Sequence, residues 1–230
     1  MRTSNGKTEA TLYSDCATGI QAISNHQEQV DPNLQNLKAD SRQGLTLLVK
    51  LPAHVTRNIS FVLNDLKKLE PFQYYYTANT IHITVMDIRR AVPDFHMSKE
   101  KLINYRQVIQ EKIENVNAIN WHLAGLICSP GAILVKGFYS SELQQLRNGL
   151  RASLLKNGLL LDERYATFSG HATVARFKKK LIHPQEFLNE INNFHNVELG
   201  DFQASEVDLV IHDWYNRQPH LIERFSLKTT

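Results

Sequence analysis

Residues 81–85, Ile-His-Ile-Thr-Val, and residues 170–176, Gly-His-Ala-Thr-Val-Ala-Arg, are the two stretches of this sequence that decide its fold. Both are rich in β-branched and small apolar residues, a composition that favours a strand between turns. Side chains alternate between the two faces of a strand, so the histidine and the threonine of each stretch point the same way. Each stretch therefore presents an imidazole beside a hydroxyl on one face of a sheet.

The two stretches occupy matching places in an internal repeat. A hydrophobic strand over 45–51 and a helix over 59–69 precede the first, and a strand over 132–138 and a helix ending near 157 precede the second. The tripeptide Leu-Val-Lys recurs after 86 residues and the histidine after 89. This order of elements predicts a duplication whose two lobes, related by a pseudo-twofold axis, bring equivalent residues together.

The remaining elements complete an α+β domain over 44–230. Beyond the repeat, the patterns predict extended segments at 74–77 and 80–86, a helix from Ser98 to about 113, strands at 119–128 and 171–177, a short helix at 184–194, and a final strand pair at 206–213 and 220–227. Residues 1–43 form a polar N-terminal extension with one short helix near 17–23, and we expect it to be partly disordered or packed on the surface.

Bulk properties restrict the class of protein. The chain has 230 residues, 42% hydrophobic and 21% charged, with a formal charge of +3. This mild basicity suits a phosphate-bearing ligand but is less than tight duplex binding demands. Cys16 and Cys128 lack metal or disulfide spacing, and no signal peptide or apolar run of membrane-spanning length occurs. We expect a cytoplasmic monomer that needs no membrane and no protein partner.

The paired motifs suit phosphodiester chemistry. Of the two imidazoles, His82 and His171, one can take a proton from water while the other gives a proton to the leaving oxygen. The hydroxyls of Thr84 and Thr173 can bind the non-bridging phosphate oxygens. This chemistry requires no metal and no cofactor, so we expect none.

Chance and packing offer simpler explanations. A His-x-Thr tripeptide arises by chance roughly once in two chains of this composition, and the sequence has a third, His54-Val55-Thr56, which we interpret as a helix entry with Thr56 as its cap. A lone strand histidine is more often a core residue. A metal site is also open, but Asp87 is the one carboxylate near the first motif. Six other histidines show no metal-ligand spacing and receive no function: His96, His122, His183, His195, His212 and His220.

Several further residues are candidates for substrate binding. Arg176 can neutralise phosphate, but strict alternation places it opposite His171, so it needs a bulge or a strand end to reach the same face. The alternative is a solvated surface arginine. Residues 178–180 are three lysines that either face solvent or steer RNA. Four aromatic residues are candidates for base stacking, with core packing as the alternative: Tyr76, Phe138, Tyr139 and Phe168.

These motifs resemble those of the two-histidine (2H) phosphoesterase superfamily, in particular its LigT-like branch of RNA 2′,5′-ligases and cyclic phosphodiesterases. Residues 170–176 are similar to the family's PHxTLAR pattern and 81–85 to its HxTL strand. The run 130–138 is similar to the segment before the second motif, and 206–210 with 223–227 to the C-terminal hairpin. The resemblance covers about 45–227. It departs at Gly170, where relatives have proline, and at Val85-Met86-Asp87, where many have leucine followed by phenylalanine and glycine.

The resemblance implies a bilobal fold in which two antiparallel sheets with outer helices enclose a central cleft. It also implies metal-independent hydrolysis of a 2′,3′-cyclic or related nucleotide phosphate, or of 2′,5′-linked RNA, with His82 as general acid and His171 as general base. A nucleotide or an RNA terminus would be the partner, as substrate. Two alternatives remain open, a 2′,5′-ligase activity and a module of the same fold that binds an RNA end or nucleotide without turning it over.

Overall fold

The computed structural model describes residues 3–4, 7–8, 13, 16–163 and 166–229. Its α+β fold confirms the predicted class. The elements, in chain order, are β1 (Thr3–Ser4), β2 (Lys7–Thr8), α2 (Cys16–Ser24), the 3₁₀ helix η1 (Pro32–Gln35), β3 (Gln43–Lys50), α3 (Ala53–Leu69), β4 (Tyr74–Tyr75), β5 (His82–Val92), α4 (Lys99–Ile113), β6 (Ile119–Ser129), β7 (Ala132–Tyr139), α5 (Ser141–Lys156), β8 (Ala172–Arg176), α6 (Pro184–Asn193), β9 (Glu198–Ala204), β10 (Glu206–Asp213) and β11 (His220–Ser226). None of the described helices is both long and apolar enough to cross a membrane.

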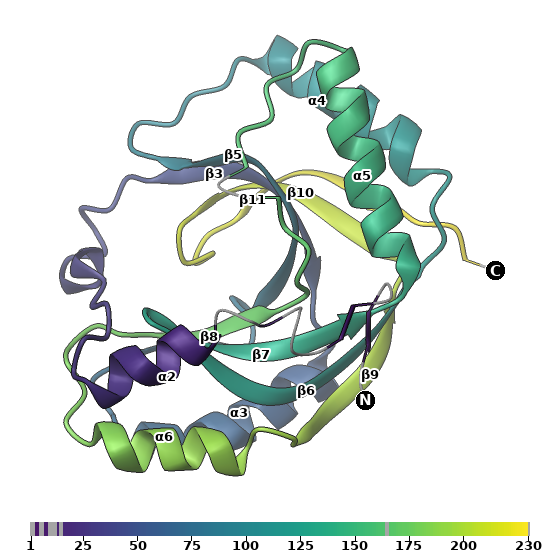
Figure 1. Cartoon of the computed structure of the whole chain (residues 1–230). Helices are drawn as coiled ribbons and strands as arrows, with labels where there is room; N and C mark the ends of the chain where they lie inside the picture. Colours follow the sequence, from purple (N-terminus) through teal and green to yellow (C-terminus); the bar gives the residue numbers. More distant parts are fainter. Residues whose placement is uncertain (1–2, 5–6, 9–12, 14–15, 164–165, 230) are drawn as a thin grey trace.

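One curled antiparallel sheet forms the centre of the molecule. Its strands follow the order β11-β10-β3-β5-β8-β7-β6-β9, and β4 pairs with β8 as a side branch. Helices α4 and α5 cover one half of this curve, and α2, α3 and α6 cover the other (Figure 1). The two predicted sheets are therefore two halves of one sheet, because β5 and β8 join them.

The predicted repeat is visible in the topology. The unit β3-α3-β5 corresponds to the unit β7-α5-β8, and each ends on a central strand at the junction. The strands of each unit lie in one half of the sheet, whereas its helix packs with the helices that cover the other half. The junction itself is narrow, since β5 and β8 pair at Ile83 and Ala172 alone. The two predicted motifs thus flank the single ladder pair between β5 and β8.

The helices form where the apolar spacing predicts them. In α3, Ile59, Val62, Leu63 and Leu66 are buried at helical spacing. Ser98 caps α4, its hydroxyl accepting a hydrogen bond from the Lys101 amide. The expectation for Thr56 is wrong, because α3 begins after Pro52 and the Thr56 hydroxyl donates back to the Ala53 carbonyl within the first turn.

The N-terminal extension is ordered over much of its length and bridges the two halves of the sheet. Leu34 is 1% exposed, so the extension shares the core. On one side the Asp31 amide donates to the Phe177 carbonyl just after β8, and on the other the Asp31 carboxylate accepts a hydrogen bond of 2.8 Å from the Tyr215 hydroxyl after β10. Residues 26–42, which we call the strap, thus tie the loop after β8 to the β10–β11 hairpin. The rest of the extension up to residue 15 lies largely outside the described residues.

Candidate active site

The two motifs meet at the junction between the halves of the sheet. Ile83 lies opposite Ala172, both side chains are fully buried, and the histidine and threonine on either side of each are partly exposed. Extending this antiparallel register by one residue puts His82 across from Thr173, and Thr84 across from His171. Diagonal neighbours of this kind are roughly 7–8 Å apart. One face of the junction therefore carries two imidazoles and two hydroxyls, with room for a phosphate between the rings.

Each imidazole is held in the same way. Nδ1 of His82 lies 2.9 Å from the Thr80 carbonyl oxygen, and Nδ1 of His171 lies 2.9 Å from the Ser169 hydroxyl. In both motifs the partner is two residues before the histidine, as a repeated unit would have it. Because a carbonyl can only accept, His82 carries its proton on Nδ1 when it is neutral. Within the described part of the chain, neither ring has a hydrogen bond at Nε2, which leaves that atom accessible to a substrate.

Burial and positive charge keep His171 neutral. Burial, followed by the charges of Arg147 and Arg176, lowers the pKa of His171 to about 4. Burial also lowers the pKa of His82 below its ordinary value, but its hydrogen bond to Thr80 acts in the opposite direction. Near neutral pH, His171 is therefore neutral and able to accept a proton.

Arg176 reaches the histidine face by the route that the sequence required. The register of β8 against β7 shifts by one residue, because Leu134 pairs with Thr173 while Ile133 pairs with Ala175. Val174 is the extra residue of this bulge, and it reverses the alternation beyond it. Nε of Arg176 donates a 3.0 Å hydrogen bond to the Tyr76 hydroxyl. The guanidinium charge lowers the pKa of both histidines, which places it near the site.

The β10–β11 hairpin contributes residues that the sequence analysis missed. The ring of His212 lies edge-on to the ring of His82, with 5.6 Å between the two centroids. The centre of the Trp214 ring lies 5.4 Å from the guanidinium carbon of Arg176. Asn216 donates a 3.2 Å hydrogen bond to the Thr80 carbonyl that also holds His82. Figure 1 shows this hairpin, in yellow, curling into the concave side of the sheet. Nothing in the local sequence pattern signals that curl, and we had assigned His212 no function.

Two glycines explain why the second motif lacks the family's proline. A Cβ atom on Gly170 would lie 2.7 Å from side-chain atoms of both Trp121 and Tyr139. A Cβ atom on Gly137 would lie 1.9 Å from the Gly170 carbonyl oxygen. The loop before His171 therefore passes too close to β7 for any side chain at these positions.

Three of the four aromatic residues predicted to stack bases are buried. Tyr76, Phe138 and Tyr139 are between 4% and 5% exposed, whereas Phe168 is 38% exposed. Burial leaves these three rings little surface for a base, and Phe138 and Tyr139 line a separate pocket that contains neither motif, so their stacking on a base stays a prediction. Tyr76 instead accepts the hydrogen bond from Arg176, and the Tyr139 hydroxyl donates to the Phe168 carbonyl. Phe168, three residues before His171, remains the candidate for stacking.

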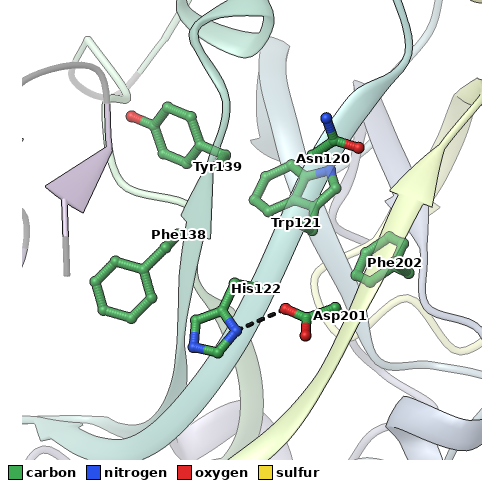
Figure 2. A pocket seen from close by; sticks show the side chains of 7 residues that line it. All are labelled: Asn120, Trp121, His122, Phe138, Tyr139, Asp201 and Phe202. Carbon is green, nitrogen blue, oxygen red and sulfur yellow. Dashed lines mark hydrogen bonds and ion pairs between the residues drawn. The ribbon is translucent and has the colours of Figure 1, made fainter.

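A separate pocket of about 500 Å³ lies over β6, β7 and β9 (Figure 2). Trp121 stacks on Phe202 there, and Nδ1 of His122 lies 2.7 Å from an Asp201 carboxylate oxygen. The pocket contains neither His-x-Thr motif, so we place the chemistry at the junction. Among the residues that the structure describes, no three histidine, cysteine or carboxylate side chains form a group that could hold a metal ion.

Comparison with solved structures shows the same fold in other proteins. TT0787 of Thermus thermophilus is 19% identical, with a TM-score of 0.58 over 81% of this chain and 97% of its own. LigT of E. coli, crystallised with 3′-AMP, is 16% identical, with a TM-score of 0.56 over 82% of this chain and 99% of its own. ATU0111 of Agrobacterium tumefaciens, a protein of unknown function, is 15% identical, with a TM-score of 0.60 over 91% of this chain and 98% of its own.

Sequence comparison identifies the family. No curated protein matches the chain. The family model described as "AKAP7 2'5' RNA ligase-like domain" matches residues 48–217, well over half of the chain and including both motifs. The protein therefore belongs to the family of AKAP7 2′5′ RNA ligase-like domains, within the LigT-like two-histidine phosphoesterases.

Proposed function

We propose that this protein is a metal-independent phosphodiesterase that hydrolyses a 2′,3′-cyclic nucleotide phosphate, or 2′,5′-linked RNA, with His82 and His171 as its acid–base pair. One observation carries the proposal. The two His-x-Thr motifs flank the single ladder pair between β5 and β8, and each ring is fixed at Nδ1 by the residue two positions earlier. Two fixed and adjacent imidazoles are what a phosphodiester needs to exchange one P–O bond for another.

The reaction follows from the two free ring nitrogens. Nε2 of His171 takes a proton from water as the water oxygen forms a bond to phosphorus. The bond from phosphorus to the 2′ or 3′ oxygen breaks, and Nε2 of His82 gives its proton to that leaving oxygen. The product is a phosphomonoester and a free hydroxyl. Proton exchange with solvent then returns both rings to their starting states.

The environments of the two rings support this division of roles. A general base must be neutral before it acts, and a pKa of about 4 keeps His171 neutral at any pH well above that value. A general acid must start protonated. Burial and the charge of Arg176 lower the pKa of His82, whereas its hydrogen bond to the Thr80 carbonyl and the negative charge of Asp213 act in the opposite direction. A bound phosphate would add to these two effects and favour the protonated ring.

Groups around the pair suit the charge of a phosphate. Thr84 and Thr173 share the histidine face, so their hydroxyls can donate to the non-bridging oxygens as charge develops there. Arg176, held by Tyr76, supplies positive charge beside both rings. The related LigT of E. coli was crystallised with 3′-AMP and with phosphate, which supports a nucleotide phosphate as the class of ligand.

The test uses adenosine 2′,3′-cyclic phosphate and a 2′,5′-linked adenylyl dinucleotide with EDTA present. Wild-type protein should hydrolyse at least one of them, and His82→Ala and His171→Ala should each lower kcat by ~100-fold or more. His54→Ala is the matched control, because His54 belongs to the third His-x-Thr tripeptide but lies exposed on α3. Full activity in either motif variant would refute the mechanism, and binding without product would favour a non-catalytic module.

A further inference from the structure

An arginine occupies the buried face of α5, where the sequence pattern calls for an apolar residue. Arg147 lies four residues after Leu143 and three before Leu150, and its side chain is fully buried with theirs. A leucine or methionine there would fill the stripe without the cost of burying a charge. Packing of α5 alone therefore does not account for an arginine at this position.

The guanidinium binds three backbone carbonyls of the candidate site. Nε of Arg147 donates to the Val85 carbonyl at 2.7 Å. Nη2 donates at 3.0 Å to the Thr84 carbonyl and at 3.0 Å to the Ser169 carbonyl. One nitrogen atom thus connects the first motif with the residue whose hydroxyl holds the His171 ring.

These bonds lie where the sheet stops connecting its two halves. Strands β5 and β8 pair at Ile83 and Ala172, and among the described residues the next bridge between β5 and the chain that leads into His171 is Arg89 with Asp162, so the bonds of Arg147 lie in the gap between these two pairs. We propose that Arg147 is a positioning residue that continues this interrupted ladder, and so fixes the distance and orientation of the two His-x-Thr motifs relative to each other. The proposal rests on the proposed function where it concerns catalysis.

The positive charge of Arg147 also acts on the candidate active site. Among the described residues, no carboxylate lies within ion-pair distance of Arg147. Glu163 is the acidic residue that acts on its pKa, but the Glu163 carboxylate is paired with Arg151. The centre of the Tyr139 ring lies 5.7 Å from the guanidinium carbon of Arg147. Tyr139 and Tyr13 both act to raise the pKa of Arg147.

The groups that act on His171 come from three elements. Arg147 on α5 is the charge with the largest effect, followed by Arg176 on β8 and His82 on β5, and all three lower its pKa. An uncompensated guanidinium at this point therefore helps to keep His171 neutral, as a general base must be.

Two variants separate the geometric role from the charge. Arg147→Lys keeps the charge but cannot reproduce the planar fork, so kcat for adenosine 2′,3′-cyclic phosphate should fall ~10- to 100-fold while KM stays within about threefold. Arg147→Gln removes the charge, so the pKa of His171, followed by NMR titration of its ring protons, should rise toward 6.5. Arg106→Met, which breaks an exposed ion pair on α4, should change neither.

The outcomes are decisive for Arg147 whatever the substrate. Unchanged kcat in Arg147→Lys, or a rise in KM alone, would overturn the proposal, the latter by making the residue a substrate contact. If Arg147→Gln does not fold, the kinetics of Arg147→Lys decide. If wild-type protein hydrolyses neither test substrate, the proposed function fails, and the NMR titration of Arg147→Gln then decides by itself. An unchanged His171 pKa in that folded variant would contradict the role given to its charge.

Discussion

Acid should destabilise this protein through its partly buried histidines, and His212 provides a sharp test. Burial, with the neighbouring His82, lowers the pKa of His212 from 6.5 to about 3. Between these two values the unfolded chain binds a proton that the folded protein does not bind. Stability is therefore complete above about pH 6.5 and is lost as the pH falls toward 3. From about pH 7 to about pH 5, one such histidine costs ~2 kcal/mol of the free energy of unfolding.

Phenylalanine at position 212 keeps the ring but cannot titrate. Urea unfolding followed by circular dichroism, at about pH 7 and about pH 5, gives the loss of stability in wild type and in His212→Phe. The variant should lose ~2 kcal/mol less than wild type, and His96→Phe, at an exposed position, should lose as much as wild type. Equal losses in wild type and His212→Phe would show that His212 is not held neutral in the fold, and the reasoning from burial would fail.

Two further predictions concern pH and the strap. The pH profile of kcat/KM should peak on the acidic side of 6.5. Activity is lost at low pH as His171 gains a proton near pH 4, and at higher pH as His82, whose pKa is lowered from 6.5, loses its proton. A plateau extending above pH 8 would contradict this assignment. Tyr215→Phe removes the hydrogen bond to the Asp31 carboxylate, so urea unfolding should show a loss of ~2 kcal/mol with kcat within about twofold of wild type. Unchanged stability would mean that this bond does not secure the strap.

The sequence predicts most of the fold because the apolar residues repeat at regular intervals. Strand β3, helix α4 and helix α5 all lie within a few residues of their predicted places. Strand β9 was missed, because the alternation of polar and apolar residues in Glu198–Ala204 is broken at Gly200, a glycine with positive φ, and Asp201. Such an edge strand carries little of the signal that identifies a buried one.

Within the site, only what depends on alternation was predictable. The shared face of the histidine and threonine in each motif, and the need for a bulge before Arg176, both follow from the two-residue period of a strand. His212 could not be predicted, because the curl of the β10–β11 hairpin brings it to His82 from 130 residues away in sequence. Arg147 carried a signal that was overlooked, since it interrupts a stripe of leucines on α5.

The narrow junction between the halves of the sheet also has a mechanical consequence. If one half rotates relative to the other about the Ile83–Ala172 pair, each atom moves in proportion to its distance from that pivot. The reacting groups sit beside the pivot and would hardly move, whereas the hairpin is held by the strap to the loop after β8. Such a rotation would strain the contacts of the strap well before it changed the spacing of the two imidazoles.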